Sequence, residues 1–142
     1  MSDTWTQKSL SATAALRMAS AAVEAATTMG LSASIVVSDQ AGTPKVTVRM
    51  DGASPMTGQV ASDKAFTAAC AQMPTAMWSS VFSGDVFAAH KFASSIDRFC
   101  TMPGGIPVNV DGVVVGAIGV SGGDDDQDVA IATAGIAALT SL

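Results

Sequence analysis

Two cations, one carboxylate and a glycine pair are the residues of this sequence best suited to ligand chemistry: Arg49, Asp51, Lys64 and Gly104-Gly105. Arg49 and Asp51 lie in an alternating segment, so their side chains share one face of the expected strand. If the helix that carries Lys64 lies over this strand, the charged groups line a pocket suited to a small carboxylated ligand. The paired glycines would let backbone N–H groups approach that ligand closely. The alternative is a structural ion pair of Asp51 with Arg49 or Lys64.

The same residues fit two classes of function. In a binding protein, Arg49 and the N–H groups of Gly104 and Gly105 hold a small organic ligand, expected to be carboxylated. In a cofactor-independent enzyme of the tautomerase, hydratase or hydrolase type, Lys64 or Asp51 is the catalytic residue that moves a proton. Arg49 and the glycine amides then hold carboxylate or enolate oxygens of the substrate. The residues alone leave both classes open.

His90 is the only histidine of the chain. A metal site that needs two imidazoles therefore cannot form within one chain. His90 is retained as a candidate substrate-binding or proton-transfer residue, because imidazole titrates near neutral pH. The alternative is an ordinary surface residue, since its neighbour Lys91 is charged.

An acidic cluster precedes the last predicted helix and consists of Asp124, Asp125, Asp126 and Asp128. Its spacing fails as a calcium loop, because position 6 is Val129 instead of glycine and position 12 is Gly135 instead of glutamate. We therefore predict no dedicated metal site. Capping of a helix N-terminus is the expected use of these acids.

The bulk composition indicates one folded domain over residues 1–142, with 49% hydrophobic and 13% charged residues. The net charge of −5 repels phosphate backbones and anionic lipids, so we expect neither nucleic acid nor a membrane as a partner. The first residues lack the basic start and apolar run of an export signal, which makes the cytoplasm the expected location. Cys70 and Cys100 are expected to be reduced.

Hydrophobic spacing indicates an α/β domain of the α+β type, with an antiparallel sheet. Asp111-Gly112 is typical of a tight hairpin turn. The patterns predict helices over residues 9–29, 58–73, 75–82 and 126–142, and strands over residues 33–39, 45–51, 107–110 and 113–121. The last strand is apolar on both faces, so we expect it in the middle of the sheet. Residues 83–97 show no clear pattern.

Several motifs in series resemble the haem-degrading GlcG/HbpS family, to which the C-terminal domain of PduO-type proteins is related. The matching strings are RMDGA at 49–53, DKAFTA at 63–68, GGIP at 104–107, GAIGVSGG at 116–123, and Gln127-Asp128. The resemblance extends from the first helix to the last, apart from residues 74–102.

The resemblance implies a central antiparallel sheet of about five strands flanked by helices, assembled into homo-oligomers, with octamers known in the family. It implies a small-molecule-binding protein, with haem or a related tetrapyrrole as candidate cofactor, or an accessory protein in small-acid or aromatic catabolism. Haem-binding relatives of the PduO type place a histidine in the first helix, and residues 9–29 of this chain contain none.

Overall fold

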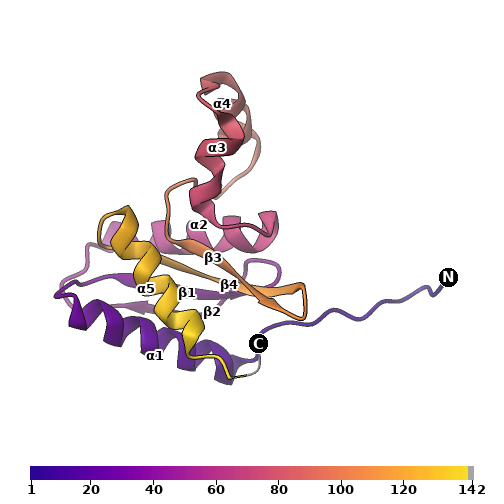
Figure 1. Cartoon of the computed structure of the whole chain (residues 1–142). Helices are drawn as coiled ribbons and strands as arrows, with labels where there is room; N and C mark the ends of the chain where they lie inside the picture. The colour runs from indigo at the N-terminus through magenta and orange to yellow at the C-terminus, as the bar shows by residue number, and fades with distance from the viewer. Residues whose placement is uncertain (141–142) are drawn as a thin grey trace.

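The computed structural model describes residues 1–140, which form a four-stranded antiparallel sheet between two layers of helices (Figure 1). The strand order is β2-β1-β4-β3. The strands are β1 (Ser34–Asp39), β2 (Pro44–Arg49), β3 (Gly105–Val110) and β4 (Val113–Ser121). The α+β fold class and the antiparallel sheet are confirmed, with four strands instead of about five. The segment between α2 and β3 adds short helices and no strand to the sheet.

Both predicted hairpins are present, and β4 lies inside the sheet between β1 and β3. Asp111 and Gly112 have φ angles of 52° and 77°, the left-handed conformation that a two-residue hairpin turn requires. Pro107 is tolerated because β3 is an edge strand.

One face of the sheet is covered by α1 (Ala12–Thr28) and α5 (Asp125–Ala137). Their small residues pack with Met18, Ile118 and Ile131 in the main hydrophobic core. Ser11 begins α1 by accepting a hydrogen bond from the Ala14 N–H at 3.1 Å. The final helix was expected to reach residue 142. It ends at Ala137, and residues 141–142 lie outside the described part of the chain.

The other face is covered by α2 (Pro55–Ala71), which lies unusually close to β4. A Cβ atom on Gly119 would meet the Ala65 amide nitrogen at 2.6 Å and the Ala61 carbonyl oxygen at a still shorter distance. The close approach thus requires glycine in β4 and alanine on the helix. It brings the side chain of Lys64 to the sheet.

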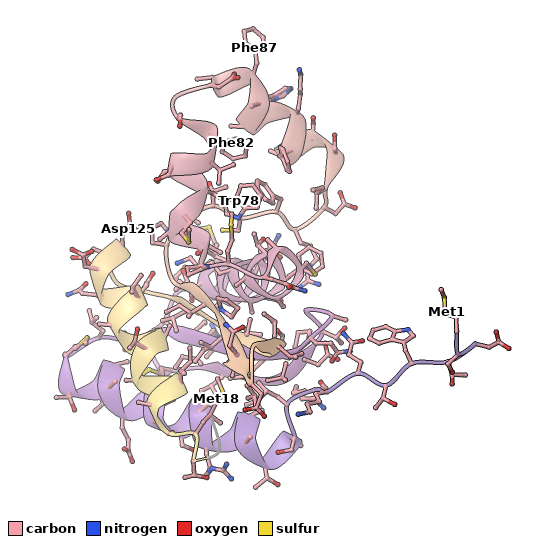
Figure 2. The ribbon with its side chains drawn as sticks, turned by 45° about the vertical axis from the view of Figure 1, so that its right-hand side comes forward. Met1, Met18, Trp78, Phe82, Phe87 and Asp125 are labelled. Carbon is pink, nitrogen blue, oxygen red and sulfur yellow. The ribbon has the colours of Figure 1, made fainter. Side chains whose placement is uncertain are left out.

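A helical arm projects from the domain and is formed by η1 (Thr75–Met77), α3 (Trp78–Phe82) and α4 (Val86–Ser95) (Figure 1). We call residues 75–99 the arm. Its helices are joined by four mutually contacting rings, with centroids 4.9–6.3 Å apart: Trp78, Phe82, Phe92 and Phe99. Phe87 lies at the outer end and is 79% exposed (Figure 2). None of the helices described in residues 1–140 has the length and hydropathy needed to cross a bilayer.

Candidate functional site

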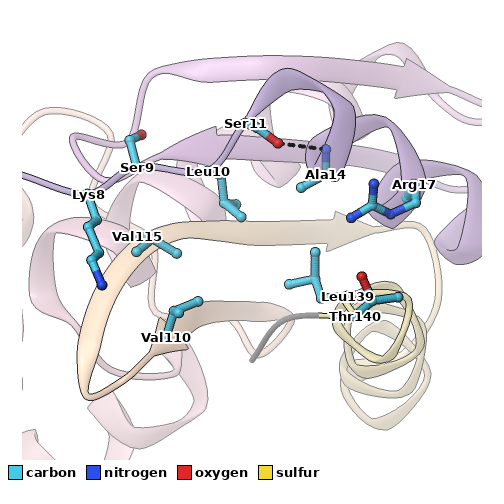
Figure 3. A pocket seen from close by; sticks show the side chains of 10 residues that line it. All are labelled: Lys8, Ser9, Leu10, Ser11, Ala14, Arg17, Val110, Val115, Leu139 and Thr140. Atoms are coloured by element: carbon cyan, nitrogen blue, oxygen red, sulfur yellow. Dashed lines mark hydrogen bonds between the residues drawn. The ribbon is translucent and has the colours of Figure 1, made fainter.

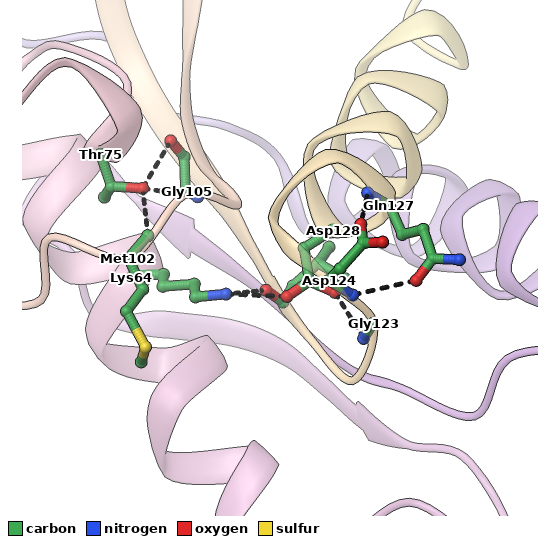
Figure 4. A network of polar contacts seen from close by, with 9 residues as sticks. Lys64, Thr75, Met102, Gly105, Gly123, Asp124, Gln127 and Asp128 are labelled. Atoms are coloured by element: carbon green, nitrogen blue, oxygen red, sulfur yellow. Dashed lines mark hydrogen bonds and ion pairs between the residues drawn. The ribbon is translucent and has the colours of Figure 1, made fainter.

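Lys64 is buried at the junction of three elements (Figure 4). Its ammonium donates to a carboxylate oxygen of Asp128 on α5 at 3.0 Å and to the Val120 carbonyl on β4 at 2.7 Å. The other Asp128 oxygen accepts from the Gly123 N–H at 2.8 Å. Lys64 and Asp128 are only 2% and 3% exposed, so the pair is held away from water. The network joins α2, β4 and the start of α5.

Gly104 and Gly105 lie beside this ion pair, as the sequence interpretation required. A Cβ atom on Gly104, whose φ is +124°, would lie 2.9 Å from the Lys64 nitrogen. The Gly105 N–H donates to the Thr75 hydroxyl at 3.0 Å, and that hydroxyl donates to the Met102 carbonyl at 2.7 Å. The close approach that the glycines allow is therefore to the protein's own atoms.

Arg49 and Asp51 lie at the exposed edge of the sheet. Arg49 ends β2 and pairs in register with Ser34 on β1. β1 therefore lies between Arg49 and β4, the strand whose Val120 carbonyl accepts from Lys64. Across residues 1–140, neither Arg49 nor Asp51 takes part in a recorded ion pair. The structural alternative proposed Asp51 as the partner of Arg49 or Lys64. The carboxylate that pairs with Lys64 is that of Asp128.

Two of the acids at the start of α5, Asp124 and Asp128, have separate roles. Asp124 accepts from the Gln127 N–H at 2.8 Å, and the Gln127 side chain accepts from the Asp124 N–H at 2.9 Å, a reciprocal capping box. Capping was the expected role of the cluster, whereas the ion pair of Asp128 was not foreseen. Within the described part of the chain, no three His, Cys, Asp or Glu side chains are grouped for a metal ion.

His90 lies on α4 of the arm, apart from the Lys64 network. It is exposed and lines a cavity of about 320 Å³. The other lining residues are mostly apolar: Phe82, Val86, Ala89, Ala93, Phe99 and Thr101. The structure therefore places the only imidazole of the chain at the edge of an apolar cavity.

A second cavity, of about 370 Å³, lies between α1, the β3–β4 hairpin and the end of α5 (Figure 3). Leu10, Val115 and Leu139 give it apolar walls, and Lys8 and Arg17 contribute cationic groups. The Lys8 ammonium lies 3.7 Å from an oxygen of Asp111, and both side chains are largely exposed. This arrangement suits an amphipathic anion. Sequence reasoning missed it because its walls come from segments far apart in the chain.

The two cysteines are free thiols, as expected. Burial raises the pKa of the Cys70 thiol, and burial is also the main reason why the pKa of the Cys100 thiol is raised. Both groups are therefore protonated at neutral pH and are weak nucleophiles. Neither thiol has the properties of an activated catalytic cysteine.

The fold defines a class of small α+β domains in which helices cover both faces of an antiparallel sheet and an arm precedes β3. A family model described as haem degrading protein HbpS-like matches residues 10–137. The chain belongs to this HbpS-like family.

Two curated relatives support the assignment. PduO of Salmonella typhimurium, a corrinoid adenosyltransferase, is 33% identical over 120 residues, which are 84% of this chain and 35% of PduO. The chain thus spans about a third of the length of that relative. GlcG of Escherichia coli K12 is 33% identical over 92 residues, covering 63% of this chain and 64% of GlcG.

Solved structures agree with the fold. A double mutant of HbpS from Streptomyces reticuli superposes with a TM-score of 0.87 at 35% identity, over 97% of this chain and 92% of the other. The haem complex of PduOC superposes with a TM-score of 0.86 at 30% identity, over 93% and 96% of the two chains. The PduOC structure shows that a relative with this fold binds haem.

Proposed function

We propose that this protein binds a small organic molecule and that haem or a related tetrapyrrole is its leading candidate ligand. One observation supports a binding site on the arm: His90 lines the apolar cavity there. Histidine is a common axial ligand of haem iron, and an apolar pocket accepts the faces of a macrocycle. The rings of Phe82 and Phe99 supply such walls here.

The residues around His90 fit haem in donor type and polarity. The imidazole would supply the iron ligand, and the phenyl rings would exclude water from one edge of the macrocycle. Bound haem would supply a redox-active iron. The family resemblance implied iron ligation from the first helix, but α1 contains no histidine, so this proposal places the ligand on the arm.

Titration with hemin tests the proposal. We expect a saturable shift of the Soret band with the unaltered protein, and a loss of at least tenfold in affinity with His90→Ala. Lys91→Ala, at the neighbouring exposed position on α4, is the matched control and should leave the titration unchanged. A non-saturating response of the unaltered protein, or equal binding by His90→Ala, would reject the proposal.

A carboxylated ligand is the second candidate, and the cavity between α1 and α5 favours it. Arg17 and Lys8 provide cations beside apolar walls, the combination that an amphipathic carboxylate requires. This candidate includes an accessory role in small-acid or aromatic catabolism. Calorimetric titration with octanoate tests it, because Arg17→Met should weaken binding at least fivefold if the guanidinium holds the carboxylate.

Proton transfer by Lys64 or Asp51 is supported less well by the geometry. The Lys64 ammonium is enclosed and bonded to Asp128 and Val120, so a substrate would have to displace both partners. Asp51 is exposed and lies in the turn that follows Arg49 at the end of β2. We therefore propose that Lys64 maintains the fold.

We also propose that the protein assembles with copies of itself in the cytoplasm, with the octamer as the expected form. The arm supports the assembly, because Val81, Val86 and Phe87 are 55%, 78% and 79% exposed. Exposed apolar side chains that gather on one projecting element mark a surface that a partner can cover. Light scattering after size exclusion should give a multiple of the chain mass, and Phe87→Ser should reduce it.

A further inference from the structure

A third cavity lies where the arm joins α2, and its chemistry differs from that of the His90 cavity. Its volume is about 240 Å³. Aromatic and small side chains line it: Phe66, Thr67, Cys70, Ala71, Trp78, Phe92, Ile96 and Phe99. Only Phe99 is shared with the His90 cavity. An engineered apolar cavity of about 150 Å³ holds benzene, so this volume accommodates one substituted aromatic ring.

Trp78 lines this largely apolar wall, and its indole carries a polar group without a partner among the described residues. The residue is 8% exposed, and its indole Nε1–H makes no hydrogen bond within residues 1–140. A buried donor left unpaired costs free energy, so such groups in native structures call for an explanation. An acceptor on a bound molecule would satisfy the indole.

The other polar side chains of the wall are already engaged, and the Cys70 thiol donates to the Ala41 carbonyl at 3.5 Å. The Thr67 hydroxyl donates to the Arg98 carbonyl at 3.2 Å and accepts from the Cys100 N–H at 2.9 Å. Trp78 is therefore the lining residue whose strong hydrogen-bonding group is left without a partner by the described part of the chain.

The charges around the cavity argue against an ionic ligand. The nearby Arg98 guanidinium lies 4.6 Å from the centre of the Phe66 ring and is bonded to Ser62 and Asp63. No ionised side chain is among the lining residues, since burial raises the pKa of the Cys70 thiol. A carboxylate would enter this cavity without a counterion, which is unfavourable.

We propose that the cavity between the arm and α2 binds a neutral molecule with a single aromatic ring and one hydrogen-bond acceptor, which receives the Trp78 Nε1–H. The four rings around it provide edge and face contacts for the aromatic ring. The site is independent of haem binding at His90.

The test uses the chain with Trp5→Phe, which leaves Trp78 as the only indole. Trp5 is 78% exposed and precedes α1, so its replacement should not alter the cavity. The probes are acetophenone and α-methylstyrene, which differ by a carbonyl oxygen in place of a methylene group. We expect acetophenone to shift the single indole N–H signal downfield in a saturable manner, as a new hydrogen bond requires.

Two further variants locate the site. Ala71→Leu adds a larger side chain to the α2 wall of the cavity and should weaken acetophenone binding at least tenfold. Ala130→Leu, on the exposed surface of α5, should leave the affinity for acetophenone unchanged. Trp78→Phe should weaken the binding of acetophenone about fivefold more than the binding of α-methylstyrene, because one net hydrogen bond corresponds to that factor. Backbone amide shifts are the readout for this variant.

The face of the Phe99 ring offers the competing explanation of the unpaired indole. The Trp78 and Phe99 rings are nearly perpendicular, at 81°, with centroids 4.9 Å apart, so an N–H could face the ring instead of a ligand. In that case acetophenone would give no saturable indole shift, or Trp78→Phe would weaken both probes equally. Either result, or unchanged binding by Ala71→Leu, would overturn the proposal.

Discussion

Replacing Lys64 by Met removes the ammonium from the buried ion pair but keeps an unbranched apolar side chain of similar length. Asp128 then retains only the Gly123 N–H as a donor, and the Val120 carbonyl loses its side-chain donor. Removing one partner of a buried ion pair costs about 3–5 kcal/mol, because the other charge remains without compensation. This is a large part of the 5–15 kcal/mol by which ordinary domains are stable.

Urea unfolding followed by far-UV circular dichroism measures the effect. With a slope of about 2 kcal/mol per molar, a loss of about 4 kcal/mol lowers the midpoint by about 2 M. The double variant Lys64→Met, Asp128→Leu should recover most of the loss, because it leaves no unpaired charge. Lys91→Met, an exposed lysine of the arm, is the control and should change stability by no more than about 0.5 kcal/mol.

A Lys64→Met protein within about 1 kcal/mol of the unaltered one would refute the structural role of the pair. The Lys64 ammonium would then be available for chemistry, and proton transfer would become the stronger hypothesis. The double variant separates a structural ion pair from an ammonium free for chemistry. A stabilising pair predicts that the double variant loses less stability than the two single substitutions together.

Three further outcomes are expected. Gly119→Ala should lower the stability by about 3 kcal/mol in urea unfolding, because its Cβ would clash with Ala61 on α2; an unchanged midpoint would show that α2 shifts freely. Asp124→Ala should cost about 1 kcal/mol in a thermal melt through loss of the helix cap, and no change would contradict the capping role. Because their pKa values are raised, Cys70 and Cys100 should react slowly with iodoacetamide at neutral pH and faster as the pH rises above the ordinary thiol range. Rapid reaction of either at pH 7 would contradict the raised pKa.

The parts of the fold that sequence predicted are those determined by local interactions. The Asp111-Gly112 turn needs only two residues that accept positive φ, and the apolar pattern of β4 follows from its central place. The short helix expected over residues 75–82 is present as η1 and α3, whereas the outer part of the arm, residues 83–97, escaped prediction. α4 has only ten residues and none of them is buried, so the stretch is too short for hydrophobic periodicity to identify the helix.

The site was predictable only in part. The proximity of Lys64 to Gly104 and Gly105 emerged from the motifs, but the partner of Lys64 did not. Asp128 is 64 residues away and stands among several similar acids. Which of these acids points inward depends on the residue at which α5 begins, because that fixes the face of the helix on which each acid lies. The cavities likewise depend on distant segments. The cavity at Trp78 requires the arm to lie against α2, and the cavity at His90 requires α3, α4 and Phe99 to come together.

The position of haem iron relative to His90 tests the central functional proposal most directly. Crystals of the hemin-loaded protein, measured at the iron absorption edge, would give an anomalous peak whose place depends on no assumption about the pocket. We predict the peak beside the cavity of Phe82 and Phe99, at bonding distance from an imidazole nitrogen of His90. A peak beside α1, or one that occupies the same place in the His90→Ala protein, would contradict the proposal.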